Sequence, residues 1–149
     1  MRRRALIVVL LSLALATTDL VVKNEIPTQP WNFHQRTAAW VVLSFCVLAA
    51  VAALAILPSR AVAVFAGVLD GGGLGNLVSA LQHRLIVPNP FVAGPFAFNL
   101  ADTFVFVGVV GLVASLSVVA RRHRRHLLPP RRWERALVRR LVPEQQTPE

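Results

Sequence analysis

Four long apolar stretches, separated by short polar or proline-containing segments, set the pattern of this chain. The stretches cover about residues 5–22, 37–57, 61–81 and 99–120. A helix of about 20 predominantly apolar residues is long enough to cross the hydrocarbon core of a bilayer. The pattern therefore predicts an all-α integral membrane protein with four transmembrane helices.

The composition agrees with a membrane protein and adds a basic charge. Hydrophobic residues make up 55% of the chain and charged residues only 15%, whereas soluble domains usually carry about a quarter of charged residues. The net charge of +9 could indicate nucleic-acid binding, but the arginines gather at the chain ends beside apolar spans. We therefore predict contact with the lipid bilayer and no nucleic-acid partner. Cys46 is the only cysteine, which excludes an internal disulfide, and we predict neither a metal nor another cofactor.

The distribution of Lys and Arg predicts the orientation. Of 16 such residues, 13 belong to the N-terminus, the turn at 58–60 and the tail, and only Lys23, Arg36 and Arg84 belong to the other two connections. The positive-inside rule then places both termini in the cytoplasm. The first stretch also resembles a secretory signal peptide, with Ala14-Leu15-Ala16 as a possible cleavage site, but it continues far enough to span.

The chain divides into a membrane domain, residues 1–120, and a basic cytoplasmic tail, residues 121–149. Four apolar residues of the tail recur at helical spacing with arginines around them: Trp133, Ala136, Leu137 and Leu141. This spacing predicts a short amphipathic helix on anionic lipid. The alternative is a solvated charged tail without a partner.

Polar residues inside or at the edge of the apolar stretches are the candidate functional residues, because such groups are costly in a membrane. Asp70 and Asn76 interrupt the third stretch beside a run of glycines, and Asn99 and Asp102 open the fourth. The glycines are explained equally well by close helix packing. Asp19 and Lys23 end the first stretch at a spacing that puts them on one helix face, where they can pair.

Four segments resemble motifs of the lipoprotein signal peptidase (signal peptidase II) family, which are four-helix membrane aspartyl proteases of the bacterial plasma membrane. Asp19 and Lys23 match the family's Asp-x-x-x-Lys. The segment QRTAAW from Gln35 is similar to a degraded copy of Asn-x-Gly-Ala-Ala-Phe. GGGLGN, ending at Asn76, matches the start of Gly-Gly-x-x-Gly-Asn-x-x-Asp-Arg, and FNLAD, ending at Asp102, matches Phe-Asn-x-Ala-Asp in full.

The departures from these motifs concern the reaction centre. The resemblance implies that Asp102 is catalytic together with an Asp in the third helix, but Ser79 and Ala80 stand where that Asp and the following Arg are expected. Pro88 stands where an acidic residue is usual. Two facing carboxylates act by sharing a proton, which a lone serine hydroxyl does not do. The resemblance also implies that Ser79 faces Asp102, and that the supporting or substrate-binding residues are Asn76, Asn99, Asp19, Lys23 and Gln35.

Three functions follow from these observations. The first is a catalytically degenerate signal-peptidase-II-like protein that binds a membrane peptide or lipid. The second is an active endopeptidase that cleaves prolipoprotein signal peptides with Asp102 and either Asp19 or another group. The third is an assembly factor unrelated to lipoproteins, which uses its basic tail to hold anionic lipid or a cytosolic partner.

Overall fold

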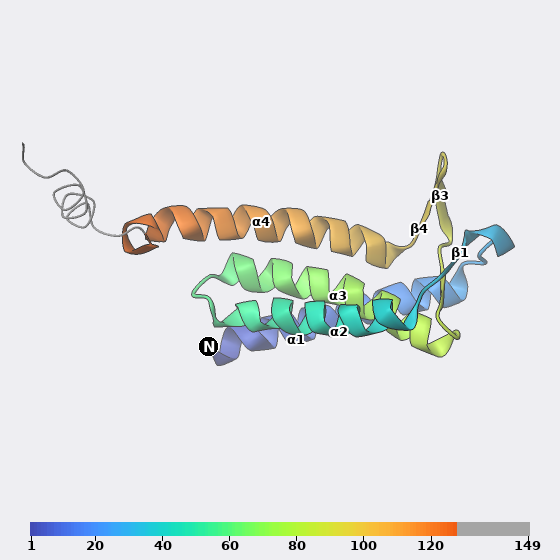
Figure 1. Cartoon of the computed structure of the whole chain (residues 1–149), viewed down its shortest axis with the longest axis horizontal. Helices are drawn as coiled ribbons and strands as arrows, with labels where there is room; N and C mark the ends of the chain where they lie inside the picture. The colour runs from blue at the N-terminus through green and yellow to red at the C-terminus, as the bar shows by residue number, and fades with distance from the viewer. Residues whose placement is uncertain (128–149) are drawn as a thin grey trace, which may run out of the picture. The chain divides into compact units, whose positions relative to one another are not determined.

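The computed structural model describes residues 1–127, and the predicted tail helix lies outside the described residues. Met1–Ser115 form one compact unit, and the chain from Leu116 on belongs to a second. The predicted spans are confirmed by four helices that are long and apolar enough to cross a membrane. Figure 1 shows them as α1 (Arg2–Glu25), α2 (Ala38–Ala53), α3 (Arg60–Gln82) and α4 (Leu100–Leu127). Short 3-10 turns lie at Pro30–Asn32 and, directly after α2, at Leu54–Ile56.

The starts of α2 and α3 are fixed by hydroxyl caps. The Thr37 side chain accepts a hydrogen bond from the Trp40 amide at 3.1 Å, and the Ser59 side chain accepts one from the Val62 amide at 3.3 Å. The first amides of a helix have no partner within the helix, so a hydroxyl one residue before it stabilises that end. These caps explain why the helices begin where polar segments meet the apolar stretches.

α3 is the central helix of the unit Met1–Ser115. In the most apolar 18-residue stretch of each helix, 56% of the residues are buried in α3, against 22% in α1 and 11% in α2. Its glycines are sites of close approach. A Cβ on Gly75 would lie 2.7 Å from Asp19 Oδ2, and a Cβ on Gly72 would lie 2.8 Å from the Val105 amide nitrogen of α4. Only residues without a side chain permit such approach, so packing accounts for these glycines.

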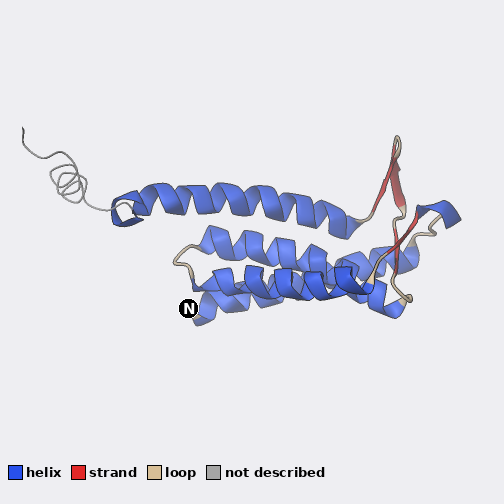
Figure 2. Ribbon diagram, in the orientation of Figure 1, coloured by secondary structure: helices blue, strands red, loops and turns tan. Residues whose placement is uncertain are grey.

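The connections at one end of the helices contain short strands, where the sequence indicated only loops (Figure 2). β1 (Phe33–Gln35) pairs antiparallel with β2 (Ile86–Pro88), and β3 (Phe91–Ala93) pairs with β4 (Phe96–Phe98). The turn between β3 and β4 contains Gly94 at a φ of 60°, a backbone conformation that glycine adopts without strain. Because β1 lies between α1 and α2 and β2 lies between α3 and α4, the β1–β2 pair joins these two connections.

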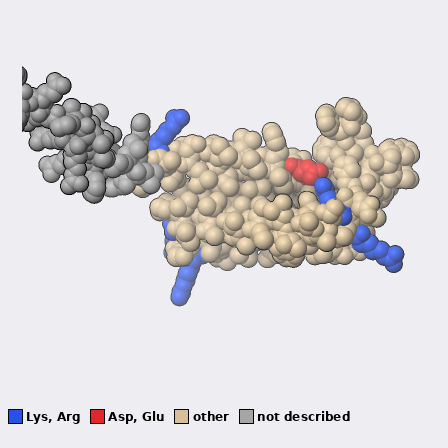
Figure 3. Space-filling model, in the orientation of Figure 1, with Lys and Arg blue, Asp and Glu red and all other residues tan. Residues whose placement is uncertain are grey.

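The surface agrees with a multi-pass membrane protein. Large apolar side chains are exposed along the helices, among them Leu10, Leu43, Phe106 and Val113. On the face drawn in Figure 3, most of the described surface is neutral, and acidic atoms form one small patch. The orientation with both termini in the cytoplasm stays a prediction.

Candidate functional site

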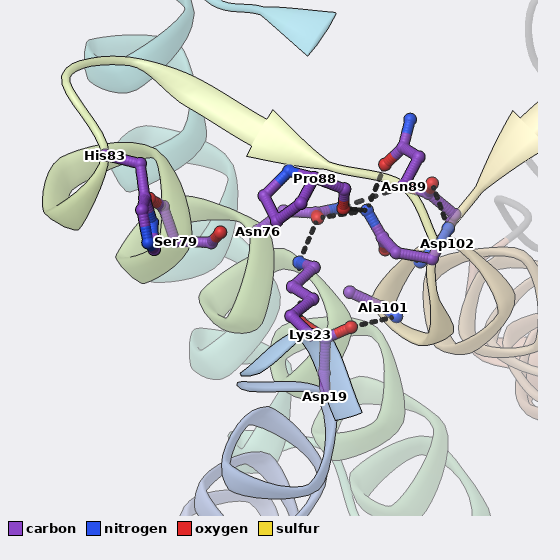
Figure 4. Close-up of polar contacts among 10 residues, drawn as sticks. Asp19, Lys23, Asn76, Ser79, His83, Pro88, Asn89, Ala101 and Asp102 are labelled. Carbon is purple, nitrogen blue, oxygen red and sulfur yellow. Dashed lines mark hydrogen bonds and ion pairs between the residues drawn. The ribbon is translucent and has the colours of Figure 1, made fainter. Parts of the chain in front are cut away.

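The site begins with an ion pair at the end of α1. Lys23 Nζ lies 2.7 Å from Asp19 Oδ2, and both side chains are buried. The other carboxylate oxygen, Oδ1, accepts a hydrogen bond from the Ala101 amide of α4 at 2.8 Å. Both oxygens of Asp19 are therefore engaged, one by a cation and one by the open end of a helix (Figure 4).

Asn76 connects this ion pair to Asp102. Lys23 Nζ donates to Asn76 Oδ1 at 2.8 Å, and Asn76 Nδ2 donates to Asp102 Oδ1 at 2.8 Å. Asn76 is buried, and the amide presents one acceptor to the cation and one donor to the carboxylate. It thus lies between the ammonium group and the second carboxylate.

Asn99 and Asp102 form a reciprocal cap on the first turn of α4. Asn99 Oδ1 accepts from the Asp102 amide at 2.9 Å, and Asp102 Oδ2 accepts from the Asn99 amide at 3.1 Å. Each side chain satisfies the backbone donor of the other, as in a capping box. A carboxylate in the first turn also interacts favourably with the helix dipole. The Asn-x-x-Asp spacing in the sequence is typical of such a cap.

Asn89 is the member of this cluster that the sequence did not indicate. It directly follows β2, is fully buried, and accepts from Asn99 Nδ2 at 2.6 Å. Its own Nδ2 lies 2.8 Å from His34 Nδ1. An amide nitrogen only donates, so His34 Nδ1 is the acceptor. Asn89 joins the β1–β2 pair to the polar cluster, which we define as Asp19, Lys23, Asn76, Asn89, Asn99 and Asp102.

Ser79 does not join the polar cluster. Its hydroxyl is buried and has no hydrogen-bond partner among the described residues. His83 Nδ1 lies 2.9 Å from the backbone oxygen of Ser79, and a ring nitrogen that bonds a carbonyl must donate. It is therefore not a base for the Ser79 hydroxyl. Figure 4 places Ser79 and His83 at one side of the view and Asp102 at the other. The pairing of Ser79 with Asp102 stays a prediction for which the structure provides no contact.

Gln35 also lies apart from the cluster. It is exposed on β1, opposite Ile86 in the strand pair, and within residues 1–127 its side chain makes no hydrogen bond. Its neighbour Arg36 instead stacks over the ring of Trp40, at 5.0 Å from the guanidinium carbon to the ring centroid. The role predicted for Gln35 stays a prediction, and the residue of this segment that lines the groove beside the cluster is Arg36.

A groove of about 320 Å³ adjoins the polar cluster. Asp102 and Asn76 line its polar part, and Arg36 and Trp40 provide one cation and one aromatic ring. The remaining lining is mainly apolar and comes from α2, α3 and α4: Leu43, Ser44, Val47, Leu48, Leu69, Gly73 and Val105. An apolar pocket with a few convergent polar groups is the usual form of a ligand site. It suits a ligand with an apolar body and one polar end.

Two solved structures, both described as a bacterial membrane enzyme, resemble this chain. One is 19% identical, with a TM-score of 0.55, and the match covers 73% of this chain and 91% of that one. The other is 18% identical, with a TM-score of 0.56 and coverage of 73% and 86%. This chain shares the fold of these two structures. No protein-family model and no curated protein sequence matches it.

Proposed function

We propose that this chain is a signal-peptidase-II-like protein of the bacterial plasma membrane that binds a membrane peptide or lipid without cleaving it. The observation that carries the proposal is the set of partners around Asp102. Each of its two oxygens accepts a hydrogen bond from a neutral amide, one from Asn76 and one from the Asn99 backbone. These contacts engage both oxygens within the fold, which favours a structural role for this carboxylate.

An aspartic dyad needs a second carboxyl group that shares a proton with the first. Among the described residues, no carboxyl group makes a hydrogen bond to Asp102. Asp19 is close in the network, but it is paired with Lys23 and bonded to the Ala101 amide. Lys23 and Asn76 connect the two carboxylates. The two carboxylates therefore do not contact each other directly, as the members of a proton-sharing dyad do.

The groove supports the binding part of the proposal. The groove adjoins Asp102, and binding there does not require a pair of catalytic carboxyl groups. Its apolar walls fit a hydrocarbon chain or an apolar peptide segment. Arg36, stacked on Trp40, offers a cation at the groove lining. We propose that it contacts a polar or anionic end of the bound molecule. The proposed ligand, a membrane peptide or a lipid, is present in the bilayer that surrounds the helices.

The test measures binding and cleavage in the same proteoliposomes, with a fluorescent prolipoprotein signal peptide as the probe. We expect the wild type to bind the peptide and to leave it intact. Val47 lines the groove and is 45% exposed, so Val47→Trp should fill the space and weaken binding about tenfold, which corresponds to about 1.4 kcal/mol. Val42→Trp, at an exposed position of the same helix that does not line the groove, is the matched control and should bind like the wild type.

Cleavage by the wild type that disappears in Asp102→Asn would overturn the proposal and favour the active endopeptidase, with Asp19 as the next residue to substitute. Equal binding by Val47→Trp and Val42→Trp would remove the groove as the site. The variants Ser79→Asp and Asn89→Asp each introduce a second carboxyl group. Cleavage by each variant measures which position can pair with Asp102. Because Asn89 already contacts Asn99, we expect any recovered cleavage to be larger for Asn89→Asp.

A further inference from the structure

Asp70 is a buried carboxyl group that the polar cluster does not include. It is 6% exposed, and its Oδ1 has no hydrogen-bond partner among the described residues. It lies ten residues after Arg60, the first residue of α3, which is about 15 Å along a helix axis. This is half of a hydrocarbon core of about 30 Å. Asp70 therefore lies near the midplane, where a carboxyl group without a partner is costly.

A second cavity, of about 390 Å³, gives access to Asp70. One stripe of α1 within Val8–Leu13 and one stripe of α2 within Phe45–Ala52 form its sides, and Asp70 and Leu74 of α3 line its floor. The outer lining is open to lipid, since Leu13 is 53% and Phe45 is 54% exposed. The three stripes follow helix axes, so the cavity is elongated in the direction in which another membrane helix would lie. Only Leu48 lines both this cavity and the groove beside Asp102.

We propose that this cavity docks a membrane-spanning helix of another protein that carries a Lys or Arg near its midpoint, with the cation paired to Asp70. Lipid does not satisfy Asp70, because acyl chains carry no hydrogen-bond donor at that depth. A second copy of this chain is also a poor source of the cation. The basic residues of the described helices lie near helix ends, and Lys23 is already paired.

The charge pair provides the specificity and the apolar stripes provide the contact area. Within membranes, ionisable residues face the protein interior and pair with one another. An incoming helix covers Val9, Leu13 and Phe45 along its length and brings its cation to the one acidic group of the cavity. This arrangement selects a partner helix by a single Lys or Arg at the depth of Asp70. The selection does not depend on whether the groove binds a peptide.

The experiment uses the full chain in proteoliposomes with a fluorescent label at its C-terminus. The probes are two labelled 23-residue Leu/Ala helices that differ only at the central residue, Lys in one and Leu in the other. We expect energy transfer to show at least tenfold tighter association of the Lys helix. Asp70→Leu should abolish this preference, and Asp70→Asn should reduce it strongly. Thermal unfolding in detergent should show that Asp70→Leu is folded and at least as stable as the wild type.

Equal association of the two helices with the wild type would overturn the proposal, as would a preference for Lys that survives in Asp70→Leu. Energy transfer between two differently labelled copies of this chain that is lost in Asp70→Leu would show self-association at this surface and would also overturn it. Val42→Trp, at an exposed position of α2 that lines neither the cavity nor the groove, should retain the preference for the Lys helix. Asp70 does not line the groove, so Asp70→Leu should bind the prolipoprotein signal peptide like the wild type, which separates this outcome from the fate of the proposed groove function.

Discussion

The polar cluster around Asp102 and the isolated Asp70 differ in how their buried carboxyl groups are partnered. Both place carboxylates inside a helical membrane protein. In the cluster, the carboxylates meet the Lys23 cation, the side-chain amide of Asn76, and the backbone amides of Asn99 and Ala101 at the start of α4. Asp70 has an apolar cavity beside it and an oxygen without a partner. The difference indicates that the carboxylates of the cluster find their partners within the chain, whereas Asp70 is the group for which we propose a partner from outside it.

The largest expected effect comes from removing the cation of the cluster. Lys23→Met leaves Asp19 Oδ2 buried without a counter-ion, which typically costs about 3–5 kcal/mol of unfolding free energy. Chemical or thermal unfolding in detergent measures this loss. Arg60→Met is the control, because Arg60 is exposed, and exposed substitutions usually change stability by less than about 0.5 kcal/mol.

Equal stability of Lys23→Met and Arg60→Met would break the comparison, since the ion pair would then carry no structural role. The double variant Asp19→Asn/Lys23→Met sharpens the comparison. It removes both charges together, so it should be more stable than Lys23→Met alone.

A smaller effect is expected from Asp102→Asn. The new amide retains the shape of the carboxylate but directs a donor toward either Asn76 Nδ2 or the Asn99 amide, both of which are donors. One buried donor is left without a partner, at a cost of about 1–3 kcal/mol in unfolding free energy. Thr103→Val, at the next and exposed position, is the control for the same turn of α4. Catalytic groups are often held at a cost to stability, so an Asp102→Asn protein that unfolds at a higher temperature would favour the active enzyme.

The smallest expected effect is that of Ser79→Ala. Its buried hydroxyl has no partner among the described residues, so its removal should change the unfolding free energy by less than about 1 kcal/mol, toward higher stability. Ser12→Ala is the matched variant. The Ser12 hydroxyl lies 2.7 Å from the Val8 carbonyl oxygen and 3.2 Å from that of Gly67, and its loss should cost about 1 kcal/mol. If Ser79→Ala proves the more destabilising of the two, Ser79 has a partner that the structure lacks.

The sequence predicted the helices and the Asp19–Lys23 pair because both depend on nearby residues. The apolar stretches specify the four spans through composition alone. The spacing of Asp19 and Lys23 puts them on one face of α1, and the structure contains that ion pair. Asn99 and Asp102 are three positions apart, which is the spacing of a capping box, but this cap was not predicted.

The remaining parts of the site depend on contacts between distant segments. β1 and β2 are three residues long, pair across about 55 positions and show no clear alternation, so nothing local predicted that Asn89 enters the cluster. Ser79 follows Asn76 by three residues and lies only about 60° away around α3. The helical pattern places both near the same face, but only the packed structure shows that Asn76 reaches α4 and that the Ser79 hydroxyl does not.

The bond from Asp19 to the Ala101 amide has a consequence for biosynthesis. The two residues are 82 positions apart, so at 5–20 residues per second the ribosome makes Ala101 roughly 4–16 s after Asp19. During this interval the carboxylate has no helix end to bind. Lys23 follows Asp19 by one helical turn in the same segment, so its charge is available almost at once. The ion pair therefore provides a counter-ion for Asp19 while α4 is still being translated, and α4 later adds the Ala101 amide as the second partner.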